Sequence, residues 1–75
     1  MKKIETVEQA FTPVRIEIIE AMAEQSLNIS DVARAVYLDR NTVRYHLSII
    51  EVMTGIDPKS FYGLEKLLTM VRKRK

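Results

Sequence analysis

Residues 28–57 read NISDVARAVYLDRNTVRYHLSIIEVMTGID and predict two α-helices joined by a short turn. Asn28 suits the N-cap of the first helix, because its side-chain oxygen can accept a hydrogen bond from a free N–H of the first turn. Apolar residues then recur at helical spacing on one face: Ile29, Val32, Ala33 and Val36. We therefore expect a short amphipathic helix that begins just after Asn28.

The second helix is expected at about residues 40–54. Asp39 suits its N-cap, and Gly55 can adopt the left-handed conformation that ends a helix without a Cβ penalty. The turn between the two helices is too short for anything but a helix-turn-helix. Its core is predicted at about residues 28–55.

Two further features of these helices favour this motif. Where the helices cross closely only a small side chain fits, and Ala33 supplies it. The second helix has an apolar stripe on one face and hydrogen-bonding and aromatic side chains opposite, which suit the base edges and phosphates of duplex DNA. The candidate DNA-binding residues are Arg40, Asn41, Thr42, Arg44, Tyr45 and Ser48. We expect Asn41, Arg44 and Tyr45 to read bases, while the other three and the helix N-terminus hold phosphates.

Four short strings of this sequence also carry a family resemblance. They are NISDxA at 28–33, YxDRNTVRYHL at 37–47, IE at 50–51 and TGID at 54–57. With them, roughly residues 14–70 resemble the C-terminal helix-turn-helix of the PucR and CdaR class of bacterial transcription regulators. More loosely, residues 28–47 are similar to the DNA-binding end of Fis and of NtrC-type activators. The resemblance implies a DNA-reading module with five residues at the duplex: Arg40, Asn41, Thr42, Arg44 and Tyr45.

Two positions differ from the pattern of that class. Tyr37 stands where many helix-turn-helix proteins have glycine, so the turn needs a left-handed tyrosine, at a cost of about 1 kcal/mol, or another geometry. His46 stands where the class frequently has arginine, which removes a charge that could meet a phosphate. Because His46 lies at the edge of the apolar stripe, we expect a partly buried structural histidine rather than a base contact.

The segment before the motif predicts a supporting helix. Thr12 can cap it and Pro13 can occupy its first position, and the helix is expected to reach about Gln25. Its apolar face comprises Val14, Ile18, Ile19, Met22 and Ala23. Further upstream, a short N-terminal helix or arm is suggested by Ile4, Val7 and Phe11.

The segment after the motif predicts one more helix, opened by Asp57 and Pro58. Its expected apolar stripe comprises Phe61, Leu64, Leu67, Leu68 and Val71. No segment favours a strand. The fold class is therefore all-α: residues 1–75 form a single small helix-turn-helix domain of four to five helices.

Composition limits the other possibilities. With 75 residues the core is small and cannot easily cover the apolar residues of the last helix, so we expect a homodimer with that helix as its interface. There is no cysteine and a single histidine, so we expect no metal site, and no cofactor or small-molecule substrate is evident. No stretch approaches roughly 18 consecutive apolar residues and no signal peptide precedes residue 4, so we expect a cytoplasmic protein without a membrane span.

The net charge of +2 says little about partners until its distribution is considered. Residues 72–75 supply four of the twelve basic side chains, so the rest of the chain is slightly acidic. Five of the ten acidic residues lie before the motif, at positions 5, 8, 17, 20 and 24, whereas Arg34, Arg40 and Arg44 lie within it. This polarity favours a DNA contact within residues 28–55.

The sequence leaves two classes of function open. We expect a sequence-specific duplex DNA-binding protein, a bacterial transcription regulator that reads the major groove with the helix at 40–54. The alternative is a small helical protein-interaction or dimerisation module without DNA binding, for which Ile49 and Val52, away from the core stripe, would serve unless they pack under the last helix. An enzyme is not expected, because the sequence shows no carboxylate pair, no nucleophile with a base and no glycine-rich phosphate loop.

Overall fold

The computed structural model describes residues 10–74, and within them it contains four α-helices and no strand. The helices are α2 (Pro13–Glu24), α3 (Ile29–Val36), α4 (Arg40–Thr54) and α5 (Phe61–Arg74). None of these four is long and apolar enough to cross a membrane. Ile4 and Val7, expected in an N-terminal helix or arm, lie outside the described residues. The prediction of a small all-α helix-turn-helix domain is confirmed.

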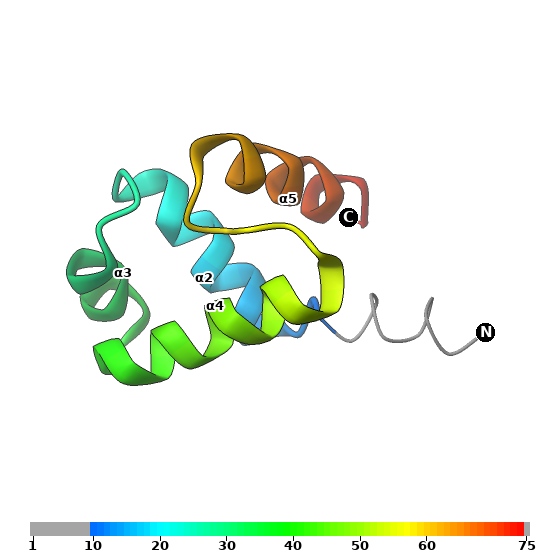
Figure 1. The fold of residues 1–75 in the computed structure, drawn as a ribbon. Coiled ribbons are helices and arrows are strands. Elements are labelled where there is room, and N and C mark those ends of the chain that lie inside the picture. The colour runs from blue at the N-terminus through cyan, green and yellow to red at the C-terminus, as the bar shows by residue number, and fades with distance from the viewer. Residues whose placement is uncertain (1–9, 75) are drawn as a thin grey trace.

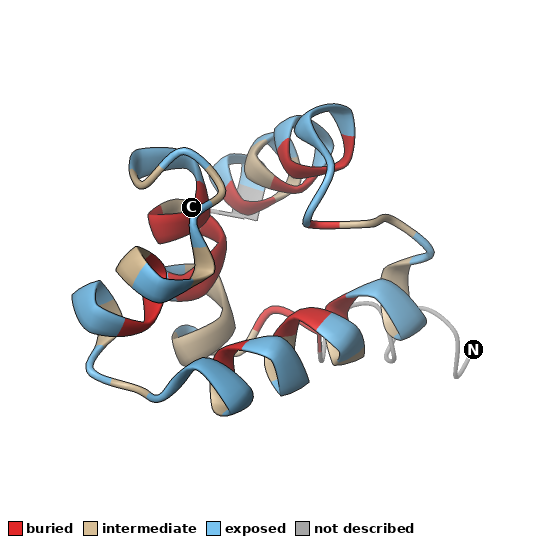
Figure 2. Cartoon of the chain, turned by 60° about the vertical axis from the view of Figure 1, so that its left-hand side comes forward, coloured by how far each residue is buried: buried red, intermediate tan, exposed pale blue. Residues whose placement is uncertain are grey.

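Helix α2 is the centre of the fold, because α3, α4 and α5 all pack against it (Figure 1). In the part of the chain that the structure describes, α3 also packs on α4, whereas α5 and α4 do not pack on each other. Ile18, Ile19 and Met22 of α2 are completely buried, and Figure 2 shows that the buried residues of the helices face inward. As a result, α4 and α5 lie on different sides of α2.

Hydrogen bonds within single turns set the starts of α2, α3 and α4. The side-chain oxygens of Thr12, Asn28 and Asp39 accept bonds from backbone N–H groups three residues later, at 3.3, 3.1 and 2.7 Å. Gly55, with φ of 74°, ends α4 in the left-handed conformation. These predicted caps are therefore confirmed, and α4 has the expected bounds.

Among residues 10–74, three residues other than glycine adopt a left-handed backbone: Ser26, Leu27 and Tyr37, with φ of 54°, 65° and 61°. The turn between α3 and α4 thus keeps left-handed geometry with a tyrosine, whose side chain is exposed. Nothing in the sequence marks Ser26 and Leu27 for this conformation. The Leu27 N–H donates to the carbonyl of Met22 at 2.8 Å and its side chain packs on the core, so tertiary contacts offset the local strain.

Helix α5 begins at Phe61, so the expectation that Asp57 and Pro58 open it is wrong. The backbone carbonyl of Asp57 accepts hydrogen bonds from both the N–H and the hydroxyl of Ser60, at 3.3 and 3.1 Å. The Ser60 oxygen in turn accepts a bond from the N–H of Gly63 at 3.0 Å. Residues 57–60 therefore form a turn, and Ser60 caps the helix.

The apolar stripe of α5 is only partly as expected. Leu64, Leu67 and Val71 are buried in the common core, so the expectation that the core cannot cover the last helix is wrong for these three. Leu68 is half-buried, whereas Phe61 is 68% exposed. The uncovered apolar surface of α5 is thus concentrated at its N-terminal end.

Candidate nucleic-acid interface

The exposed side of α4 carries most of the residues expected to bind DNA. Val43, Leu47 and Ile50 of this helix are buried, so its opposite face points outward. Five of the six candidates are exposed on this face or at the N-terminal end of the helix: Arg40, Asn41, Arg44, Tyr45 and Ser48. The structure thus brings these five together on one surface, which we call the α4 face.

Thr42, the sixth candidate, is half-buried in the first turn of α4. Its N–H donates to the carboxylate of Asp39 at 2.7 Å. Hydrogen bonds from the side chain and the backbone of Thr42 lower the pKa of Asp39, which keeps this carboxylate charged at neutral pH. Both donors of Thr42 are thus engaged by Asp39, and the hydroxyl reaches a phosphate only by giving up that bond, so Arg40 is the main phosphate contact available at this end of α4.

Arg44 is positioned by its own helix. Its Nη1 donates to the Oδ1 of Asn41, one turn earlier, at 3.3 Å. Because a guanidinium has five N–H donors, this bond leaves further donors of Arg44 for a base or a phosphate. Within residues 10–74, neither Arg40 nor Arg44 forms an ion pair, so their charges are not compensated by a carboxylate.

His46 ties α4 to α2 through a hydrogen bond. The Nε of Arg15 donates to the Nδ1 of half-buried His46 at 3.1 Å. Burial lowers the pKa of His46, and the charge of Arg15 lowers it further, so the imidazole is neutral at pH 7. The prediction of a partly buried histidine is confirmed, but its partner was missed, because a bond between residues 31 positions apart leaves no local sequence signal.

This bond predicts a pH dependence of stability. In the unfolded chain His46 takes up a proton near pH 6.5, the ordinary value, whereas its lowered pKa in the folded chain resists protonation. The stabilisation is therefore present above about pH 6.5 and is lost as the pH falls through that value towards the folded-state pKa. Denaturant midpoints measured from about pH 7.5 to about pH 5.5 should show the loss.

The variant His46→Gln is the matched control for this pH dependence. Its amide oxygen can still accept the bond from Arg15, but the side chain does not titrate. We expect the stability of the variant to change less than that of wild type between these pH values. Equal pH dependence in both proteins would contradict the role given to His46.

Val52 is an exposed residue of the α4 face that was not among the candidates. Val52 follows Ser48, Tyr45 and Asn41 by 4, 7 and 11 positions, and this helical spacing in the sequence already places it on the same face. Ile49, expected beside it on a protein-binding surface, is half-buried. Since α5 does not pack on α4 within the described part of the chain, the last helix does not cover Val52.

The acidic side chains of α2 lie away from the α4 face. Glu17, Glu20 and Glu24 line a surface hollow together with Tyr37 and the end of α3. Among residues 10–74, no three histidine, cysteine or acidic side chains are grouped so that they could hold a metal ion. The nearest charged groups on α4 itself are Arg40 and Arg44, the Asp39 carboxylate at its N-cap and Glu51 in its C-terminal half.

One comparison with known proteins identifies a family. The family model described as the PucR C-terminal helix-turn-helix domain matches residues 16–72. This range covers all of α3 and α4 and the six candidate residues. No curated protein and no solved structure matches the chain.

Proposed function

Because the chain belongs to the family of PucR C-terminal helix-turn-helix domains, we propose that it is a bacterial transcription regulator that binds duplex DNA sequence-specifically. In this proposal α4 enters the major groove, which is wide enough for an α-helix. Asn41, Arg44 and Tyr45 read base edges, while Arg40, Thr42 and Ser48 contact phosphates. A role on bacterial DNA implies a cytoplasmic location and requires neither catalysis nor a cofactor.

The observation that carries this proposal is the composition of the α4 face. It gathers two arginines without ion pairs, an amide, a hydroxyl and a tyrosine ring on a helix whose apolar residues are buried in the core. Arginine and asparagine are the side chains that form paired hydrogen bonds with guanine and adenine in the major groove.

Mobility shifts against a library of random duplexes test the proposal. We expect binding at low salt, enrichment of one sequence class and a steep loss of affinity as salt rises, because phosphate contacts release counterions. The alternative of a helical protein-interaction module predicts no shift under any of these conditions. Failure to bind any duplex at low salt would therefore reject the proposed function.

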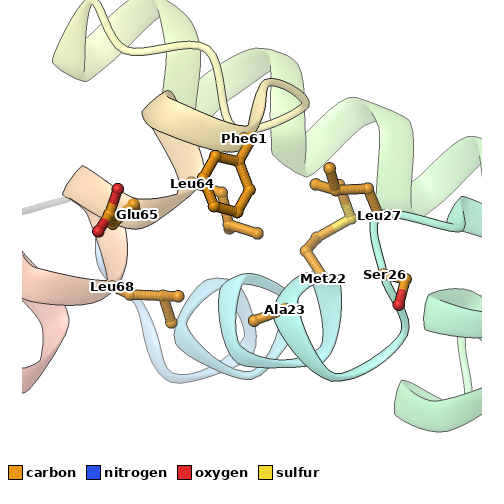
Figure 3. Close-up of a pocket in the computed structure, with 8 residues that line it drawn as sticks. All are labelled: Met22, Ala23, Ser26, Leu27, Phe61, Leu64, Glu65 and Leu68. Carbon is orange, nitrogen blue, oxygen red and sulfur yellow. The ribbon is translucent and has the colours of Figure 1, made fainter.

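We also propose that the chain acts as a homodimer, through the N-terminal end of α5. Exposed Phe61 stands beside a largely apolar pocket of about 400 Å³ between α2 and α5 (Figure 3). The pocket is lined by Met22, Ala23, Ser26, Leu27, Phe61, Leu64, Glu65 and Leu68. A two-fold interface brings the same patch of both copies together, so the exposed ring of one copy can enter the pocket of the other. Because α5 and α4 lie on different sides of α2, this contact leaves the α4 face free.

Sedimentation equilibrium at micromolar concentration tests the dimer. We expect wild type and Thr69→Glu, a control at an exposed α5 position outside the pocket, to be dimers. Phe61→Glu should be monomeric, because it places a charge in the apolar contact. A wild-type monomer at every concentration that still protects a palindromic site would rule this interface out.

A further inference from the structure

Val52 is unusual among the apolar residues of the chain. Among residues 10–74, every leucine, isoleucine and methionine and every other valine is buried or half-buried, whereas Val52 is 81% exposed. Its side chain adds nothing to the core, and no other helix covers it. We infer that Val52 is a specificity-determining residue that contacts the C5-methyl group of a thymine in the major groove. This inference rests on the proposed function.

The position of Val52 on α4 supports a contact inside the groove. It lies 4, 7 and 11 positions after Ser48, Tyr45 and Asn41, so all four occupy one side of the helix. Eleven residues of α-helix span about 16 Å, which is several base pairs along the duplex. The inference thus places α4 along the groove, so that with Asn41 at one base pair Val52 reaches the far end of the same half-site.

The chemistry of the major groove selects thymine as the partner. Its base edges present hydrogen-bond donors and acceptors, and the apolar group that it offers is the thymine methyl. Valine can neither donate nor accept a hydrogen bond through its side chain, so its favourable contact there is with that methyl group. Val52 would thus favour thymine over cytosine at one end of the half-site.

The charged groups next to Val52 are partly paired with one another. The Oε1 of Glu51 lies 3.8 Å from the Nζ of Lys59, which also lies 3.6 Å from the carboxylate of Asp57. Two carboxylates share this one ammonium group, so the cluster keeps a negative charge and the lysine offsets only part of its repulsion from DNA. This end of α4 is therefore better suited to an apolar group of a base edge than to a phosphate.

Single replacements of thymine by deoxyuridine test the contact, because deoxyuridine lacks only the methyl group. The duplex selected from the random library is measured with each thymine replaced in turn, by fluorescence anisotropy. Wild type should lose about fourfold in affinity at one thymine, the effect of one buried methylene-sized group. Val52→Ser should bind the thymine and uracil duplexes equally, and Val52→Ala, which keeps only the Cβ methyl, should show a smaller difference than wild type. Thr69→Ala, at an exposed α5 position outside the apolar pocket beside Phe61, should keep the wild-type difference.

The outcomes separate this inference from the proposed function. Wild type that binds the selected duplex but responds to no thymine replacement would overturn the inference and leave the function intact. If Val52→Ser showed the same fourfold loss of affinity on thymine replacement, another residue would make the methyl contact, and the inference about Val52 would be overturned. Absence of any DNA binding by wild type would reject the proposed function itself. Because Val52 is exposed, circular dichroism of both variants should match wild type.

Discussion

The double variant Arg44→Ala, Tyr45→Ala is expected to stay folded and to lose specific DNA binding. Both side chains are exposed on the α4 face, so their removal leaves the buried side of the helix unchanged. Arg44 alone should contribute about 1–3 kcal/mol to specific binding if its guanidinium forms paired hydrogen bonds with a guanine. Fluorescence anisotropy on the selected duplex and on an unrelated duplex measures the difference.

Arg72→Ala is the matched control for the loss of one positive charge. Arg72 is exposed on α5, on a different side of α2 from the α4 face. Its removal should leave the preference for the selected duplex unchanged. If the double variant kept the wild-type affinity and footprint, the α4 face would have no part in DNA binding.

Gly63→Ala is expected to destabilise the chain by about 1–3 kcal/mol, the usual cost of overpacking. Helix propensity alone predicts the opposite sign, because alanine is favoured over glycine by about 1 kcal/mol within a helix. A Cβ atom at position 63, however, would collide with the backbone carbonyl of Asp57 and with the hydroxyl of Ser60. The turn at residues 57–60 and the start of α5 would both have to shift.

Chemical denaturation of Gly63→Ala and of Thr69→Ala shows whether the first variant is destabilised, as expected, or stabilised. Thr69 is exposed in the same helix, and its hydroxyl donates a hydrogen bond to the backbone carbonyl of Glu65, one turn earlier. Replacement of Thr69 by alanine should therefore leave the free energy of unfolding unchanged or raise it slightly. A Gly63→Ala variant as stable as wild type would show that residues 57–60 do not pack on α5 as described.

The helix ends that could be predicted are those that depend on neighbouring residues alone. Thr12, Asn28 and Asp39 each satisfy an N–H within one turn, and Gly55 has the freedom that its left-handed backbone requires. Such bonds are set by residue type and spacing, both of which are visible in the sequence. The bounds of α4 therefore followed directly.

The features that could not be predicted depend on contacts between distant or competing groups. Asp57 and Pro58 have the types that open a helix, yet Ser60 provides the cap because its hydroxyl reaches the N–H of Gly63. The bond between Arg15 and His46 joins two helices, and its geometry exists only after they pack. The exposure of Phe61 likewise depends on how the first turn of α5 packs against α2. The spacing of apolar residues in the sequence does not reveal this packing.

For the candidate site, the sequence was enough to predict which face of α4 is exposed, but not what each side chain on it contacts. The division of α4 into buried and outward faces follows from the positions of Val43, Leu47 and Ile50, so the exposure of the candidates on the opposite face could be expected. Val52 was missed because apolar character assigned it to a protein contact. Which side chains meet bases and which meet phosphates depends on how α4 lies in the groove, and these assignments remain predictions.

Methylation interference on the selected duplex tests most directly whether α4 reads the major groove. Dimethyl sulfate modifies guanine at N7, which faces the major groove, and adenine at N3, which faces the minor groove. We predict that methylation of guanine N7 within the site blocks binding, and that methylation of adenine N3 does not. Interference confined to adenine N3, or none at any base of the site, would contradict the central claim.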